Sequence, residues 1–319
     1  MPYRAHEPLP ADAHPSARPD LVSLTTSPDP RHHPDIALSL ASLLAIRLWA
    51  RSGPRARVHQ ARQGRLGRVP GLSFRELRAY QAGDEVRHID WRVTARLGRP
   101  YTRLYGEELE QAHWLLLDLS PAMYFGSGQQ LKARLGCELA AALLWQREKQ
   151  ANTLICHGHE PKIQIQRGSL MPLLETLCLQ YEAGLDRIAP AQPLAHTLAR
   201  LSLPQGARLT IIGDHRPCEE ALRQRLQLLG RRHDIHYWQI RDPLEASLPT
   251  QGQLAVQAGK HSGWLDGSSI KFNQKYEEAA RNTAELAQQQ LLPLVQRLYR
   301  LDNGKPLQRQ WQEGGCRLL

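Results

Sequence analysis

The sequence predicts an α/β fold in which a mostly parallel sheet carries helices on both faces, with a smaller N-terminal segment. Three observations lead to this prediction. Short, continuous apolar runs are typical of strands buried on both faces. Segments with apolar residues at helical spacing alternate with these runs. Two of the runs end in an acidic residue, Asp118 and Asp214, which should meet at the edge formed by the carboxyl ends of the strands, here called the rim.

The first third of the chain is expected to contribute little to this sheet. Residues 1–35 are rich in Pro, His, Asp and Ser, a composition typical of an irregular tail. A helix is predicted from Asp35 to Arg51; its apolar run of about 15 residues is shorter than the roughly 20 that a membrane span needs. An Arg/Gly-rich stretch, Arg51 to Gly71, follows. Since the first thirty residues hold no apolar signal region, we expect a soluble, cytoplasmic protein.

The alternating pattern starts at about His113 and continues almost to the C-terminus. Each apolar run is predicted as a strand and each amphipathic segment as a helix. In chain order these are the strand Trp114–Asp118, the helix Lys132–Lys149, the strand Thr153–Cys156, the strand Arg208–Asp214, the helix Glu219–Arg232, the strand Ile235–Ile240, the helix Asn273–Leu291 and the strand Leu294–Tyr299.

Composition and charge narrow the class of protein. The 319 residues are 41% hydrophobic and 23% charged, as in a globular protein. The five cysteines form no C-x-x-C pair, which argues against a disulfide framework or a zinc knuckle. The net charge of +10, mostly from arginine, favours an acidic partner, nucleic acid or an anionic membrane, without choosing among them.

Two segments carry a resemblance to a known family. The first, Gly71–Arg96, is here called the signature segment. The second runs from Leu115 to Met123 and continues with Phe125-Gly126. Both are similar to the patterns of domain-of-unknown-function family 58. The matching positions of the signature segment are Phe74, Leu77, Arg78, Tyr80, Gly83, Asp84, Arg87, Ile89, Asp90, Trp91, Ala95 and Arg96.

The resemblance implies a fold and a role. Members of this bacterial family are similar to von Willebrand factor A domains and are often encoded beside MoxR-type AAA+ ATPases. The implied organisation is a tail (1–35), an N-terminal helix with the signature segment (36–112) and a von Willebrand factor A-like domain (113–312). The implied function is that of a non-catalytic protein-binding adaptor, or chaperone-like partner, of a MoxR-type ATPase that remodels a further protein client.

The resemblance also implies a metal-ion-dependent adhesion site at the rim. Such sites use D-x-S-x-S, a loop threonine and an aspartate to hold Mg²⁺. Asp118, Ser120 and Asp214 match, but Ala122 and Gln192 replace two hydroxyl ligands. We therefore expect no cofactor, or weak Mg²⁺. The alternative is that Asp118 caps the following helix or pairs with an arginine.

Within the signature segment, acidic and basic residues alternate between Arg78 and Arg96. One interpretation is an internal ion-pair network that joins this segment to the main domain. The other is a surface on which a partner docks. We expect the segment to pack beside or below the rim.

Residues at the predicted strand ends also allow hydrolytic or metal-binding chemistry to be considered. Ser120, Asp214 and His215 could form a hydrolase triad, but no G-x-S-x-G elbow is present. His157 and His159 could bind a metal together, although exposed loop histidines are the simpler interpretation. No G-x-x-x-x-G-K-[ST] loop occurs, so nucleotide hydrolysis is not expected.

The alternative function is nucleic-acid binding through the basic stretch Arg51–Arg68. This stretch has no interleaved aromatic residues, which favours a solvated basic face instead. The main hypothesis is that Asp118, Ser120, Gln192 and Asp214 form a partner-binding rim. Charge reversal at Asp118 and Asp214 should then weaken binding while leaving the fold intact.

Overall fold

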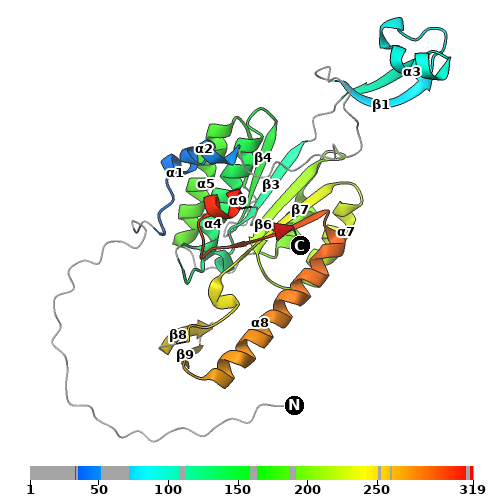
Figure 1. The fold of residues 1–319 in the computed structure, drawn as a ribbon. Coiled ribbons are helices and arrows are strands. Elements are labelled where there is room, and N and C mark those ends of the chain that lie inside the picture. Colours follow the sequence, from blue (N-terminus) through cyan, green and yellow to red (C-terminus); the bar gives the residue numbers. More distant parts are fainter. Residues whose placement is uncertain are drawn as a thin grey trace, which may run out of the picture.

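The computed structural model describes residues 33, 35–51, 72–107, 112–128, 130–158, 164–186, 192–250, 253–258, 261–313 and 317–318. Its centre is a seven-stranded sheet with the strand order β11-β10-β7-β6-β3-β4-β5 (Figure 1). The strands are β3 (His113–Asp118), β4 (Asn152–His157), β5 (Gln164–Gly168), β6 (Arg208–Asp214), β7 (Asp234–Arg241), β10 (Arg297–Asp302) and β11 (Arg317–Leu318).

The sheet is parallel except at its two edges. The neighbours β4, β3, β6, β7 and β10 all pair in parallel, whereas β5 and β11 add antiparallel edges. The predicted α/β fold with a mostly parallel sheet is confirmed. The strand order reverses between β3 and β6, because the chain first builds β4 and β5 on one side and then returns to the other. Open α/β sheets bind ligands at such a switch point, beyond the carboxyl ends of the strands.

Alternate residues of the central strands serve two separate apolar cores, one on each face. In β3, Leu115 and Leu117 belong to one core, while Trp114 and Leu116 belong to the other. Every residue of β3 is buried, which explains why its sequence is an unbroken apolar run. Each fully buried leucine contributes roughly 1.5–3 kcal/mol relative to an exposed one.

Helices from both ends of the chain cover the first face. They are α1 (Leu40–Ala45), α2 (Arg47–Ala50), α4 (Lys132–Gln146), α5 (Leu170–Leu185) and α9 (Leu307–Gln312). The indole N–H of Trp145 donates to the backbone carbonyl of Leu43 at 3.0 Å, and that of Trp311 donates to the carbonyl of Ala50 at 3.3 Å. Thus α1 and α2, predicted within region 36–112, pack on the helices that cover this face of the main sheet and not on the signature segment.

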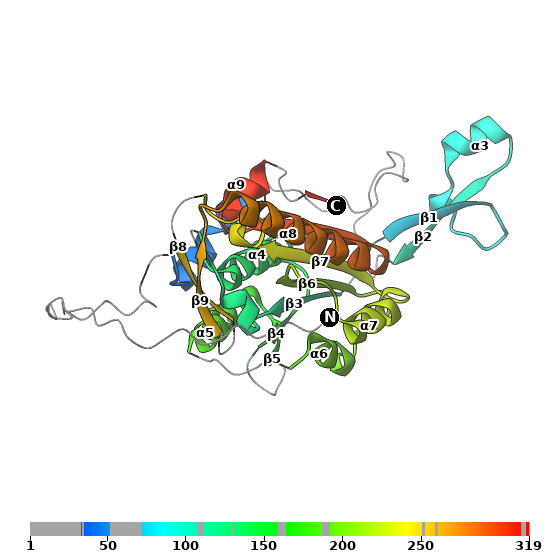
Figure 2. The same cartoon turned by 90° about the horizontal axis from the view of Figure 1, so that it is seen from below.

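The second face is covered by α6 (Leu194–Arg200), α7 (Glu220–Gly230) and α8 (Ile270–Leu291), as Figure 2 shows. Helix α8 buries only Ala287 and Leu291, at its C-terminal end. Just before α8, β8 (Gln253–Ala258) and β9 (His261–Asp266) form an antiparallel hairpin, which the sequence did not predict.

The signature segment lies in a separate small unit, here called the hairpin unit. Strands β1 (Leu72–Ala79) and β2 (Tyr101–Glu107) pair in antiparallel and enclose α3 (Trp91–Leu97). Figures 1 and 2 show this unit projecting from the end of the sheet at which β3 begins. Since β2 ends only five residues before β3 starts, the unit lies at the edge opposite the rim. The expectation that it packs beside or below the rim is wrong.

Several predicted boundaries also need correction. The helix expected from Asp35 to Arg51 starts only after the capping residue Ser39 and bends at Ile46 into two short helices. The strand expected at Leu294–Tyr299 is observed at Arg297–Asp302, because Leu292–Leu294, which contains a proline, forms a 3-10 turn. The predicted tail, 1–35, lies outside the described residues apart from His33 and Asp35. Among the described residues, no helix combines the length and apolar character needed to cross a membrane.

Candidate functional site

The two acidic strand ends meet at the rim, at the switch point between β3 and β6. Strands β3 and β6 pair in parallel, with Leu117 opposite Ile212. A Cβ atom added to Gly213 would lie 3.6 Å from the Cβ of Asp118. Asp118 and Asp214 line one cleft of about 170 Å³. The predicted meeting of these two residues, far apart in the chain, is confirmed.

Asp118 is held by its own loop and by a neighbouring histidine. One carboxylate oxygen, Oδ1, accepts the backbone N–H of Ser120 at 2.9 Å, and the Ser120 hydroxyl also bonds to this carboxylate. Burial raises the pKa of Asp118, while His157 on the adjacent strand opposes that shift. This bond lies within the loop after β3, and neither of the next two helices, which begin at Pro121 and Lys132, has a side-chain cap. The alternative that Asp118 caps the following helix is therefore wrong, and no ion pair between Asp118 and an arginine is present among the described residues.

His157 is a member of the rim that the sequence interpretation missed. It was expected as an exposed loop residue, but it lies at the end of β4 and is buried. Its Nδ1 lies 2.7 Å from the Thr197 hydroxyl, and the backbone of Gln192 also bonds to the ring. Burial lowers the pKa of His157, and Asp118 opposes that shift. His159, its proposed metal-binding companion, lies outside the described residues.

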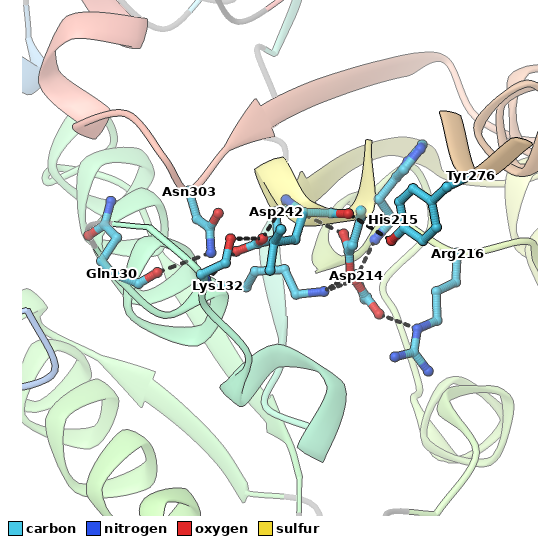
Figure 3. Close-up of polar contacts among 11 residues, drawn as sticks. Gln130, Lys132, Asp214, His215, Arg216, Asp242, Tyr276 and Asn303 are labelled. Atoms are coloured by element: carbon cyan, nitrogen blue, oxygen red, sulfur yellow. Dashed lines mark hydrogen bonds and ion pairs between the residues drawn. The ribbon is translucent and has the colours of Figure 1, made fainter. Parts of the chain in front are cut away.

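Asp214 is engaged by two cations of the chain itself (Figure 3). The ammonium of Lys132, the first residue of α4, lies 2.5 Å from Oδ1 of Asp214 and 2.6 Å from Oε1 of Glu245. Lys132 is fully buried. The guanidinium of Arg216 lies 2.5 Å from the other oxygen, Oδ2, and its side chain is 66% exposed. Two positive charges therefore face two carboxylates.

These contacts decide how well a divalent cation would fit. An adhesion-type site needs free carboxylate oxygens and hydroxyl ligands. Both oxygens of Asp214 face cations of the chain, Ala122 offers no ligand, and Gln192 is exposed beside the cleft. Within the described residues, no group of three or more acidic, histidine or cysteine side chains could hold a metal. The residues present do not fit Mg²⁺, because Lys132 and Arg216 already supply the positive charge.

Loops next to the rim are fixed by further buried polar groups. Asp242 accepts the backbone N–H of Ser127 at 2.8 Å and that of Leu244 at 2.9 Å. Burial acts to raise the pKa of Asp242, but these hydrogen bonds outweigh it and lower the pKa. Asn303 donates to the backbone carbonyl of Gln130 at 3.0 Å. The loops after β7 and β10 are thus tied to the one before α4 (Figure 3).

The cleft combines apolar walls with charged and polar groups at its mouth. Leu194 and Leu222, from α6 and α7, form part of the wall, together with Pro193. Arg216 and Glu219 line the same cleft and are exposed. A surface of this kind can contact a protein side chain or loop, with the charged pair giving orientation and the leucines giving apolar contact.

The triad considered from the sequence is not assembled. The Ser120 hydroxyl bonds to Asp118. Within the described part of the chain, neither ring nitrogen of His215 has a hydrogen-bond partner. Asp214 accepts the backbone N–H of His215 at 2.8 Å and does not orient its ring.

Ion pairs in the hairpin unit are internal to it. Arg78 Nη2 lies 2.7 Å from Asp84 Oδ1. Asp90, which is buried, caps α3 by accepting the backbone N–H groups of residues 92 and 93, and its other oxygen lies 2.7 Å from Arg103 Nη2. Gly83, with a φ of 109°, lies in the turn that follows β1. The predicted network is present, but these pairs stabilise the unit itself and do not join it to the main domain.

The remaining signature residues lie mostly on the surface of the hairpin unit. Trp91 is 64% exposed, and Arg87, Arg92 and Arg96 are also exposed. Arg87 pairs with its neighbour Glu85 at 2.7 Å. The partner-docking interpretation of this segment stays a prediction.

The basic stretch of the alternative function, Arg51–Arg68, lies outside the described residues except for Arg51. The guanidinium of Arg51 forms an ion pair with Glu148. No described contact therefore adds support to nucleic-acid binding.

Comparison with known proteins agrees with the sequence resemblance. An uncharacterized protein of Mycobacterium bovis and two of Mycobacterium tuberculosis are each 29% identical over 202 residues, which is 60% of this chain and 62% of theirs. Thus the match spans less than two thirds of these curated relatives.

Two solved structures are similar over 64% of this chain. Conserved hypothetical protein BatB of Bacteroides thetaiotaomicron matches over 96% of its length, with a TM-score of 0.36 and 9% identity. An aerotolerance-related membrane protein of Bacteroides fragilis matches over 97% of its length, with a TM-score of 0.40 and 13% identity.

The most extensive match is to a protein family. The family described as "Protein of unknown function DUF58" matches residues 76–286, from the hairpin unit to α8. This range includes both acidic residues of the rim and most of the signature segment. The chain belongs to the DUF58 family.

Proposed function

We propose that this protein is a non-catalytic adaptor that binds another protein at the rim between β3 and β6. The observation that carries the proposal is the open cleft of about 170 Å³ at the switch point. Its buried carboxylate, Asp214, is balanced within the chain by Lys132 and Arg216. Glu219, which is exposed at the mouth of the cleft, is therefore available to a partner.

The partner proposed is a MoxR-type AAA+ ATPase, acting in the cytoplasm on a further protein client. Support comes from the family, whose members the sequence analysis associates with such ATPases. In this proposal the ATPase supplies all nucleotide hydrolysis. The adaptor contributes shape, through the leucine wall of the cleft, and orientation, through Arg216 and Glu219.

The burial of Asp118 and Asp214 changes how the proposal should be tested. Both carboxylates are at least nine-tenths buried, so charge reversal there would damage the fold and could not report on binding alone. Glu219→Arg is the better perturbation, because this residue is exposed in the cleft and precedes α7. Arg216→Glu is a second variant, although it also removes the ion pair with Asp214.

The experiment immobilises the purified chain and measures capture of the MoxR-type ATPase of the same organism, with and without ATP. Glu219→Arg should reduce capture at least tenfold, as expected for an unfavourable charge in a partner contact. Arg231→Glu is the matched control, since Arg231 is exposed after α7 at the opposite end of the sheet. Equal capture by wild type and both cleft variants would refute the rim as the binding surface. Failure of the wild type to capture the ATPase would refute the proposed partner.

A further inference from the structure

A second groove lies between the sheet and α8, on the face opposite α4. It measures about 350 Å³. Four polar side chains share this face of the sheet at the ends of β6, β7 and β10: His215, Gln239, Arg241 and Arg300. The register explains their grouping, because Arg300 lies opposite Gln239 on adjacent strands, and the backbone N–H of His215 donates to Ile240.

Buried nitrogen atoms in this group lack hydrogen-bond partners among the described residues. They are Nε of Arg241, Nε and Nη2 of Arg300, and both ring nitrogens of His215. His215 is only 7% exposed and Gln239 is fully buried. The Gln239 amide is the polar group next to the His215 ring and acts to raise its pKa, but the geometry of their contact does not satisfy the buried atoms of either side chain. An unpaired buried polar group costs roughly 1–3 kcal/mol, so a cluster of them calls for an explanation.

Like charges are also held together at this position. Arg241 lies close enough to Arg300 to lower its pKa, in addition to the larger effect of burial. Burial, followed by the charge of Arg300, lowers the pKa of His215 to about 4. Arg241, Arg300 and His215, which line the same groove, are therefore close enough to influence one another electrostatically.

The acidic groups around the groove compensate the charge of this cluster only in part. Glu245 uses one oxygen for Lys132 at 2.6 Å and the other for the backbone N–H of Asp242 at 3.0 Å. Asp302 lies 3.9 Å from Arg241, at the limit of an ion pair. Glu277 and Glu285 line the groove from α8, where they are exposed, and neither forms a described ion pair with Arg241 or Arg300. The wall of the groove formed by the sheet is thus basic, whereas the wall formed by α8 carries both acidic and basic side chains.

We propose that this groove binds an oxyanion, a carboxylate or phosphate group, through Arg241, Arg300 and His215. Guanidinium groups pair with both kinds of oxyanion through parallel N–H···O bonds. A bound oxyanion would supply acceptors to the unpartnered nitrogens and separate the two like charges. The site is distinct from the rim cleft, with which it shares no lining residue, and it does not depend on the proposed adaptor function.

The test measures thermal unfolding and isothermal titration of the full chain with sodium phosphate and, separately, sodium acetate. Sodium chloride at equal ionic strength controls for general salt effects. At a tenfold excess over the dissociation constant, the specific anion should raise the Tm by about 3–5 °C above the chloride control. Stabilisation by phosphate alone, acetate alone or both supports the site and identifies the class of anion. Equal effects of all three salts would overturn the proposal.

Substitutions of Arg300 test whether the anion binds in this groove. Arg300→Gln should weaken binding of the stabilising anion at least tenfold, and Arg300→Lys should weaken it as well, because lysine keeps the charge but loses the planar fork. Arg231→Gln, the matched control with the same loss of charge at a remote exposed position, should bind like wild type. Unchanged binding in Arg300→Lys and Arg300→Gln would place the anion elsewhere and overturn the assignment.

A third variant separates ligand binding from a structural role. In chloride buffer, Arg300→Met should raise the Tm, since it removes a half-buried guanidinium of which two buried nitrogens have no hydrogen-bond partner among the described residues. The same variant should lose the anion-dependent rise in Tm. A fall in Tm in chloride buffer would show that Arg300 serves the fold and would contradict the proposal.

Discussion

Replacement of Lys132 by methionine tests the charge balance of the rim most directly. Lys132 is fully buried, with its Nζ 2.5 Å from Asp214 and 2.6 Å from Glu245. Methionine keeps the apolar stem but leaves the buried carboxylate of Asp214 with only Arg216. Breaking a buried ion pair by removing one partner costs about 3–5 kcal/mol. The exposed Arg216 restores at most about 1 kcal/mol, so the expected loss is about 2–5 kcal/mol.

Urea unfolding followed by circular dichroism measures this loss, and the Tm should fall by about 4–20 °C. The double variant Lys132→Met/Asp214→Leu removes both charges and should be more stable than the single variant. Lys275→Met, at an exposed position of α8, is the matched control and should change stability by less than about 0.5 kcal/mol. If the free energy of unfolding of Lys132→Met lay within about 1 kcal/mol of the wild-type value, the effect would be no larger than that of an exposed ion pair, and the reasoning would be refuted. A double variant no more stable than Lys132→Met would refute it as well.

Four further predictions follow from the fold and the site. Burial lowers the pKa of His113 from 6.5 to about 3. Between pH 7 and 5 the unfolded chain therefore takes up a proton that the folded chain excludes, and the free energy of unfolding should fall by about 2 kcal/mol. Urea titrations at several pH values should show that His113→Gln reduces this dependence on pH. Gly184→Ala would place a Cβ 1.9 Å from the Tyr124 hydroxyl and should destabilise the protein by about 1–3 kcal/mol. Urea unfolding curves of mutant and wild type that coincide would contradict this prediction. Asp90→Ala removes the cap of α3 and the pair with Arg103, so hydrogen exchange should accelerate in the hairpin unit while global unfolding stays unchanged; a lowered global midpoint would count against an independent unit. Calorimetric titration with Mg²⁺ should give no binding heat, and micromolar affinity would show that the argument from Lys132 fails.

The parts of the fold predicted best from the sequence are the strands buried on both faces. Strand β6 is observed at its predicted bounds, Arg208–Asp214, and β3 begins only one residue earlier than predicted. Such strands are continuous apolar runs, because neither face meets water. Strand β5 and the hairpin β8–β9 were missed. In β5, Ile165 is the one apolar side chain among polar residues and a glycine, which gives a weak signal for an edge strand.

The rim was predicted in part. Asp118 and Asp214 could be placed together because strand ends of a parallel sheet share an edge. Lys132 could not be recognised as the partner of Asp214, since a lysine at the start of a helix ordinarily suggests a solvated charge. Its burial depends on the loops that carry Glu245 and Asp214, which are distant in sequence. The anion groove was missed for the same reason: Gln239 and Arg241 look like the polar half of an alternating strand until α8 covers them.

The two tryptophan hydrogen bonds to α1 and α2 have a consequence for synthesis of the protein. Trp311 holds the carbonyl of Ala50 and packs within the same core as Leu43, so residues some 260 positions apart close one layer of the molecule. A nascent chain can assemble the central strands earlier, but this layer stays open until Trp311 has been synthesised. Ribosome-bound intermediates should consequently expose the leucines beneath α1 and α2, and truncation just after Trp311 should be tolerated far better than truncation just before it.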